Sequence, residues 1–151
     1  MVGRAEEFSE FFGEAEPRLR RALVAAYGVE RGREAAAEAL AYGWEHWSRV
    51  RRMANPVGYL YRVGQSRGRP RKHRVLVDRS HPDDVWVEPG LDKALMKLTE
   101  RQRVATVLVH GFGWTLGEVA ELTGLSVTTI QNHLERGLST LRTTLEVCDD
   151  V

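Results

Sequence analysis

The pattern that most constrains this fold lies at residues 115–142, TLGEVAELTGLSVTTIQNHLERGLSTLR. Thr115 and Glu118 have the three-residue spacing of a capping box, which marks the start of a helix. Gly124 permits a sharp turn, because a residue without a Cβ atom adopts a positive φ easily. Ser126 then caps a second helix, which carries one apolar stripe made of Ile130, Leu134, Leu138, Leu141 and Leu145. The sequence therefore predicts a helix-turn-helix.

Short polar side chains lie off this stripe, near the start of the second predicted helix. Such side chains reach base edges when the helix lies in a DNA major groove. The set comprises Thr128, Thr129, Gln131, Asn132 and His133. Arginines that could anchor phosphates nearby are Arg101, Arg103, Arg136 and Arg142. An αα-hairpin that only buries its own apolar faces is the alternative interpretation.

Charge is balanced over the whole chain, at a formal net +1, but it is strongly basic between residues 49 and 79. That segment sets a lone acid, Asp78, against Arg49, Arg51, Arg52, Arg62, Arg67, Arg69, Arg71, Lys72, Arg74 and Arg79. Such a basic belt binds phosphates, and its Tyr59 and Tyr61 offer rings that stack on unpaired bases. The alternatives are a solvated basic surface for the charges and core packing for Tyr61.

Helix-favouring residues dominate the composition, and few segments alternate with the period of a strand. In the first half we predict helices over about residues 8–27 and 32–50 and from Pro56 onward. Pro17 is expected to begin a new helical segment or to kink the first helix. In the second half a short helix carries Leu91, Leu95 and Leu98, and a capping box at Thr99 and Gln102 begins a helix that Gly111 ends.

These elements predict an all-α fold of two small helical domains. We expect a three-helix domain at residues 1–69 and a four-helix domain at residues 91–151, which ends in the helix-turn-helix. A flexible linker at residues 70–90 is expected to join them, because it contains three prolines and no helical period. Its apolar segments at residues 75–77 and 85–87 are candidate docking points for a partner.

Several classes of protein are excluded by the sequence. The histidines form no metal-ligand pair, and neither a phosphate-binding glycine loop nor a nucleophile elbow appears. We therefore predict that the chain is not an enzyme and uses no metal or cofactor. The single cysteine, Cys148, offers no intramolecular disulfide, and no membrane-spanning or signal-peptide segment is found. A cytoplasmic location is the simplest expectation.

The two halves, taken together, resemble an extracytoplasmic-function sigma factor, the smallest type in the sigma-70 family. Residues 37–69, AEALAYGWEHWSRVRRMANPVGYLYRVGQSRGR, are similar to the polymerase-binding and −10-reading part of region two. Residues 98–142, LTERQRVATVLVHGFGWTLGEVAELTGLSVTTIQNHLERGLSTLR, are similar to region four. The resemblance implies a subunit that binds core RNA polymerase and directs it to promoters.

The resemblance also implies which residues act. The polymerase β′ clamp helices would bind Glu34, Glu38, Leu40, Trp44 and Trp47, with core packing as the alternative for both tryptophans. The −10 element would be opened and read by Arg51, Arg52, Asn55, Tyr59, Arg62, Gln65, Ser66 and Arg69. Region four would bind the β flap and read the −35 element with Ser126, Thr128, Thr129, Gln131, Asn132, His133 and Arg136.

Two other functions fit the same sequence. One is a stand-alone helix-turn-helix regulator that binds spaced half-sites as a dimer without polymerase. The other is a degenerate sigma-like protein that binds a partner but supports no initiation. Sigma factors of this type are often held inactive by an anti-sigma factor, so the resemblance adds such a protein to the candidate partners.

Overall fold

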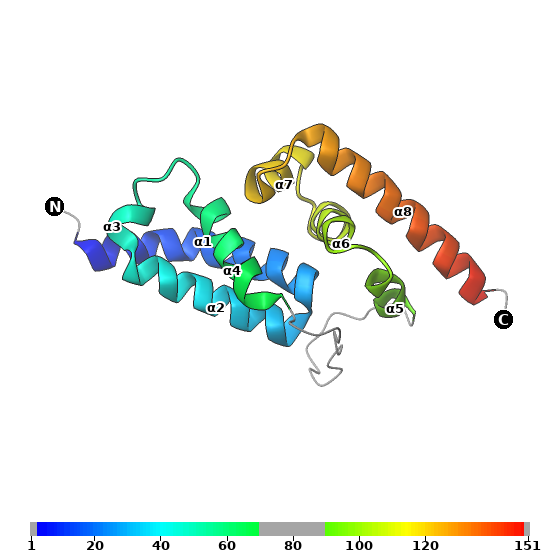
Figure 1. Cartoon of the computed structure of the whole chain (residues 1–151), viewed down its shortest axis with the longest axis horizontal. Helices are drawn as coiled ribbons and strands as arrows, with labels where there is room; N and C mark the ends of the chain where they lie inside the picture. The colour runs from blue at the N-terminus through cyan, green and yellow to red at the C-terminus, as the bar shows by residue number, and fades with distance from the viewer. Residues whose placement is uncertain (1–2, 70–89, 150–151) are drawn as a thin grey trace.

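A computed structural model describes residues 3–69 and 90–149, and every regular element in these two ranges is helical (Figure 1). The N-terminal half, residues 3–69, contains α1 (Arg4–Tyr27), α2 (Val29–Glu45), α3 (Trp47–Val50) and α4 (Pro56–Gly68). The C-terminal half, residues 90–149, contains α5 (Leu91–Met96), α6 (Glu100–Thr106), a π-helical turn (Val107–Gly111), α7 (Leu116–Thr123) and α8 (Val127–Asp149). The predicted all-α fold is confirmed.

Two expectations for the N-terminal half differ from the structure. Pro17 begins no new helical segment, because it lies within α1, a single helix. The side chains of Phe8 and Phe11, one turn or more before Pro17, pack against Trp47 and so hold the first part of α1 in place. The helix expected at residues 32–50 begins earlier, at Val29, and is divided at His46, whose φ of −111° and ψ of 27° are not helical.

Local signals in the C-terminal half were predicted correctly. Both capping boxes form. In each box, the side chain of the first residue accepts a hydrogen bond from the backbone N–H of the second, and the side chain of the second accepts one from the backbone N–H of the first. The pairs are Thr99 with Gln102 and Thr115 with Glu118. Gly124 ends α7 with a φ of +75°. None of the helices in the two described ranges has the length and apolarity needed to cross a membrane. The predicted linker, except Gly90, lies outside the described residues.

The two halves are packed against each other, which the sequence did not predict. Helix α1 contacts α6 and the π-helical turn, and α4 contacts α7. One cluster of buried side chains runs through both halves and includes Leu19 and Leu60 on one side and Leu108, Val119 and Ile130 on the other. A smaller cluster, Ala94, Leu98 and Leu141, joins α5 to α8. The boundaries of the two predicted domains remain predictions.

Helices α1 and α2 approach closely at Gly32. A Cβ atom built on Gly32 would lie 2.4 Å from Cα of Val24, an atom of the α1 backbone that no side-chain rotation can move away. Only glycine therefore permits this separation of the two helices.

We expect Gly32→Ala to lower the free energy of unfolding by about 1–3 kcal/mol, because α1 and α2 must move apart. Urea denaturation followed by circular dichroism measures this change. Gly13→Ala is the control: Gly13 lies inside α1, and a Cβ atom built on it would have no neighbouring atom within 4 Å, so the same substitution is expected to stabilise by about 0.5–1 kcal/mol. Equal losses in both variants would contradict this account of the helix contact.

Candidate nucleic-acid interfaces

The geometry of the helix-turn-helix is fixed by short polar contacts. Thr115 Oγ1 accepts a hydrogen bond from the Glu118 N–H at 3.0 Å, while Glu118 Oε1 accepts one from the Thr115 N–H at 3.2 Å. Ser126 Oγ accepts from the Thr129 N–H at 3.1 Å and caps α8. Because Ile130 is buried, α8 is anchored at its first turns while its other face remains open.

The exposed face of α8 presents a row of polar side chains. Thr128, Asn132 and Arg136 are all exposed, and their spacing of four residues places them on one side of the helix. The hydroxyls of Ser126 and Thr129 are 2.8 Å apart and take part in the cap. Gln131 Nε2 donates to Glu135 Oε1 at 3.5 Å. Thr128, Asn132 and Arg136 are therefore the predicted residues best placed to meet a ligand.

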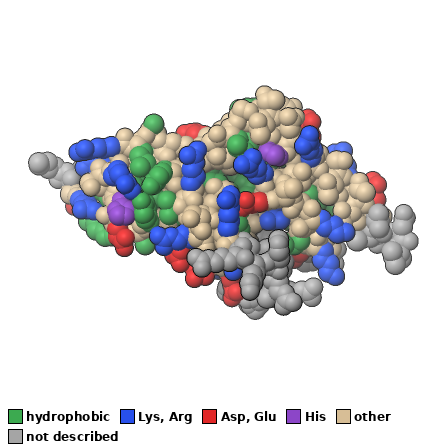
Figure 2. Space-filling view, viewed as in Figure 1, with side chains coloured by type: hydrophobic (Ala, Val, Ile, Leu, Met, Phe, Trp, Pro, Cys, Tyr) green, Lys and Arg blue, Asp and Glu red, His purple; other side chains and the backbone are tan. Residues whose placement is uncertain are grey.

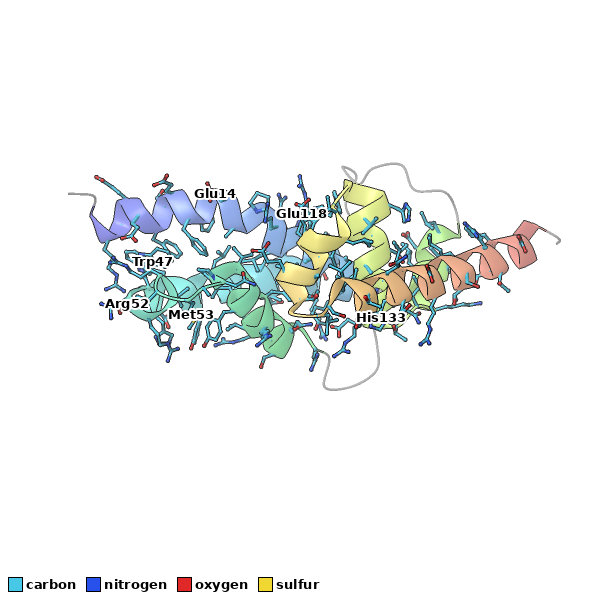
Figure 3. All side chains as sticks on the ribbon, turned by 90° about the horizontal axis from the view of Figure 1, so that it is seen from above. Glu14, Trp47, Arg52, Met53, Glu118 and His133 are labelled. Carbon is cyan, nitrogen blue, oxygen red and sulfur yellow. The ribbon has the colours of Figure 1, made fainter. Side chains whose placement is uncertain are left out.

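His133 differs from its neighbours on α8, where Figure 3 labels it. Its side chain is partly buried, and Nε2 has no hydrogen-bond partner among the described residues. Burial lowers the pKa of His133, and the nearby guanidinium groups of Arg101 and Arg136 lower it further. The imidazole is therefore held neutral at pH 7.

The residues predicted to face the −10 element divide into two groups. Asn55, Arg62, Gln65 and Arg69 point toward the C-terminal half. Asn55 Nδ2 donates to the Glu121 carbonyl at 2.7 Å, and Arg69 Nη2 lies 3.7 Å from Glu100 Oε2. The Arg62 guanidinium lies against Gly124, and Gln65 lines a polar cleft between the two halves.

The second group lies on open surface. Arg51, Arg52 and Ser66 are exposed, and Tyr59 is partly buried. Arg51 Nε lies 3.5 Å from Glu7 Oε1. Figure 3 places Arg52 at the end of the N-terminal half that is remote from α8. Figure 2 shows one face of the molecule, with Lys and Arg side chains spread over both halves. A strip of hydrophobic side chains lies among them in the N-terminal half.

Tyr59 forms a cluster with the side chains of Tyr42 and Arg49. Neither of these two residues was predicted from the sequence to belong to this site. Arg49 Nη2 donates to the Tyr42 hydroxyl at 2.6 Å, and the Tyr42 and Tyr59 hydroxyls are 3.2 Å apart. The hydrogen bond with Tyr42 raises the pKa of Tyr59. Tyr42 lies on α2, Arg49 on α3 and Tyr59 on α4, so no single helical spacing in the sequence links the three residues. Two rings beside a guanidinium suit an unpaired base and its phosphate.

The two tryptophans predicted to bind polymerase have different surroundings. Trp47 is buried, with its ring centroid 5.2 Å from Phe8 and 5.0 Å from Phe11. Trp44 is 41% exposed, and the Arg4 guanidinium lies 5.2 Å from its ring centroid. Of the two, Trp44 therefore offers its ring to a partner without rearrangement of the core.

Trp44 lies at one end of an apolar groove between α1 and α2. The groove is lined by Phe8, Phe12, Glu16, Arg20, Arg33, Ala36, Ala37, Leu40, Ala41 and Trp44. Phe12 is 42% exposed, whereas Leu40 is buried and forms part of the floor. Of the predicted acids, Glu34 is exposed and Glu38 lies 3.7 Å from Arg67. A contiguous exposed patch of large apolar side chains marks an interaction surface.

Arg103 does not have the role expected for it. Its sequence position suggested a phosphate anchor, but its Nε and Nη2 atoms donate to the carbonyls of Ala25 at 2.9 Å and Ala26 at 2.6 Å. Its Nη1 atom donates to the carbonyl of Leu98 at 3.2 Å. Burial lowers the pKa of Arg103, and the guanidinium is committed to backbone carbonyls of both halves. Its donors are therefore used by protein acceptors in this structure and not by a DNA phosphate.

Comparisons with known proteins agree with this architecture. Residues 90–141 match the family model for sigma-70, region 4. The fold is similar to that of the sigma factor RpoE, solved in complex with the anti-sigma factor NepR from Bartonella quintana, at 16% identity and a TM-score of 0.66. The similarity covers 93% of this chain and 98% of that one. The search of curated proteins found no match.

Residues 90–141 are therefore similar to sigma-70 region 4, and the chain as a whole has a fold similar to that of a solved sigma factor. Among the described residues, no group of His, Cys, Asp and Glu side chains is arranged to hold a metal ion.

We expect His133 to make stability depend on pH. Its pKa in the folded chain lies below the ordinary value of 6.5, so the unfolded chain binds the proton more readily as the pH falls. The free energy of unfolding should therefore decrease from about pH 7 to about pH 5. Urea denaturation at several pH values should show a shallower decrease for His133→Gln, whereas the neighbouring Gln131→Ala should keep the wild-type slope. Identical slopes in all three proteins would contradict this role of His133.

Proposed function

We propose that this chain directs core RNA polymerase to specific promoters, using α8 at the −35 element and the N-terminal half at the −10 element. The observation that carries the proposal is the presence of two polar surfaces of different character in one chain. One is the nearly neutral, polar face of α8, and the other is an arginine-rich surface with paired tyrosines. Duplex DNA suits the first surface and unpaired DNA suits the second.

At the −35 element, Thr128, Asn132 and Arg136 are the proposed contact residues. Asparagine hydrogen-bonds adenine and arginine hydrogen-bonds guanine in the major groove, while arginine also binds phosphate. Ser126 and Thr129 have a supporting role, because their hydroxyls complete the cap of α8. Few charges on this face give a low sequence-independent affinity, so the protein depends on polymerase to hold it at the promoter.

At the −10 element, Tyr59 is the proposed stacking residue, and Arg51 and Arg52 are the proposed phosphate contacts. The bond from Arg49 to Tyr42, and the contact of Tyr42 with Tyr59, support this role because they fix the orientation of both rings. Ser66 lies on the same open surface. The proposed surface also includes Asn55, Arg62, Gln65 and Arg69. These residues can contact DNA only when the C-terminal half has moved away from α4.

Polymerase is the proposed occupant of the groove between α1 and α2. Exposed Trp44 and Phe12 supply apolar contacts for the β′ clamp helices, and Glu34, which is exposed on α2, supplies a negative charge. The C-terminal half would bind the β flap. We place the protein in the cytoplasm, where polymerase and promoters are. An anti-sigma factor is a further proposed partner, because the similar RpoE was solved bound to one.

Reconstituted transcription tests the function. Purified chain, core polymerase and a library of promoters are expected to give transcripts whose start sites share −35 and −10 sequences. Sequence-specific binding of duplex DNA by the chain alone, without any transcript, would instead identify a stand-alone regulator. Polymerase binding without any transcript would identify an interaction protein.

Trp44→Ala should weaken binding to core polymerase by about tenfold or more, because a tryptophan that becomes buried in an interface is a typical hot spot. Fluorescence anisotropy of labelled chain with core polymerase measures the affinity. Trp44→Phe keeps an aromatic ring in the groove and should retain most of the affinity. If the alanine variant binds as tightly as the phenylalanine variant, the groove is not the polymerase site.

A further inference from the structure

Helix α8 carries a single acid among the side chains that would meet a DNA duplex. Glu135 is exposed, and it is the only acid of the chain between residues 127 and 145. It lies four residues after Gln131 and three after Asn132, so the helix places it next to both of them. None of the contacts proposed above uses this carboxylate, although it lies on the same side of α8.

Gln131 orients the Glu135 carboxylate. Its Nε2 atom donates to Glu135 Oε1 in a long hydrogen bond of 3.5 Å, and only the NH2 end of an amide can donate to a carboxylate. Among the described residues, Glu135 forms no ion pair and accepts no other side-chain hydrogen bond. Its second oxygen, Oε2, is therefore available to a donor from another molecule. A pair that only stabilises an exposed helix is the alternative interpretation.

A carboxylate on a DNA-reading face restricts which base can lie opposite it. The phosphates repel the carboxylate, and contact with the duplex removes its water, so binding is favourable only where a base supplies a hydrogen-bond donor. In the major groove, guanine offers the acceptors N7 and O6, and thymine offers the acceptor O4. Adenine presents its N6 donor beside the N7 acceptor, whereas cytosine presents the N4 donor alone. Cytosine is therefore the base that suits a carboxylate best.

We propose that Glu135 is a specificity-determining residue of α8, which accepts a hydrogen bond from the N4 amino group of a cytosine in the −35 element, and that Gln131 is its positioning residue. This inference rests on the function proposed above, because it takes α8 as the −35 reader. Asn132 and Arg136 attract the bases that they fit. Glu135 also rejects the others, because a base without a free donor leaves the carboxylate desolvated and unpaired.

Selection from a duplex library tests this assignment. Promoter duplexes with randomised −35 positions are offered to the chain bound to core polymerase and, separately, to the chain alone. The wild type should select cytosine at one position and prefer it about tenfold over the other bases. Glu135→Ala should lose this preference at that position only. It should also bind an unrelated duplex pool about twofold more tightly, because a charge that repels phosphates has been removed.

Glu135→Gln separates base reading from helix stabilisation. Glutamine keeps the length and one acceptor but adds a donor, so the preferred base should change from cytosine to adenine, which presents the matching N6 and N7 pair. Gln131→Ala should reduce the cytosine preference by about two- to threefold, because the carboxylate loses its orienting contact. Glu146→Ala is the matched control: it removes another exposed acid of α8, farther along the helix, and should leave every preference unchanged.

Unchanged base preferences in both Glu135 variants, or an equal loss of affinity for all duplexes, would overturn the assignment and leave the proposed function intact. Cytosine selection that Glu135→Ala abolishes, without any transcript from polymerase, would overturn the sigma function instead. Selection of no duplex, with or without polymerase, would overturn both.

Discussion

The guanidinium of Arg103 joins the two halves of the molecule by hydrogen bonds. The last carbonyls of any helix lack partners within that helix, and α1 has no basic residue in its own last turn. Arg103 of α6 supplies the missing donors to Ala25 and Ala26, and its positive charge meets the negative end of the α1 dipole. A hydrogen bond to a charged group contributes about 1.5–3 kcal/mol, and its removal here would also leave buried acceptors unpaired.

The shared core decides which surfaces are available to partners. Helix α6 packs against α1, and α7 packs against α4. The Glu100 carboxylate therefore lies beside the guanidinium of Arg69, at the C-terminal end of α4. The groove at Trp44 and the polar face of α8 lie outside this contact. Burial and hydrogen bonding with Glu100 raise the pKa of Tyr27, which is further evidence that the two halves form a common environment.

Local features were predictable from the sequence and long-range contacts were not. The capping boxes at Thr99 and Thr115 and the turn at Gly124 depend on residues three or four positions apart. A short stretch of sequence therefore contains all the residues needed to predict each of them. The partners of Arg103 on α1 lie 78 and 77 residues away, and nothing in the pattern around Arg103 distinguishes it from a phosphate anchor. Trp44 and Trp47 illustrate the same limit, because the helix break at His46 exposes one ring and buries the other.

Cooperative unfolding tests the shared core most directly. With 5-fluorotryptophan incorporated, ¹⁹F resonances assigned by Trp→Phe substitution report Trp47 in the N-terminal half and Trp114 in the C-terminal half. Both rings are buried in the cluster that crosses the boundary, so both native resonances should disappear at the same urea concentration, as expected for one two-state unit. Loss of the native Trp114 resonance while that of Trp47 persists would show that the halves fold separately, and would contradict the shared core.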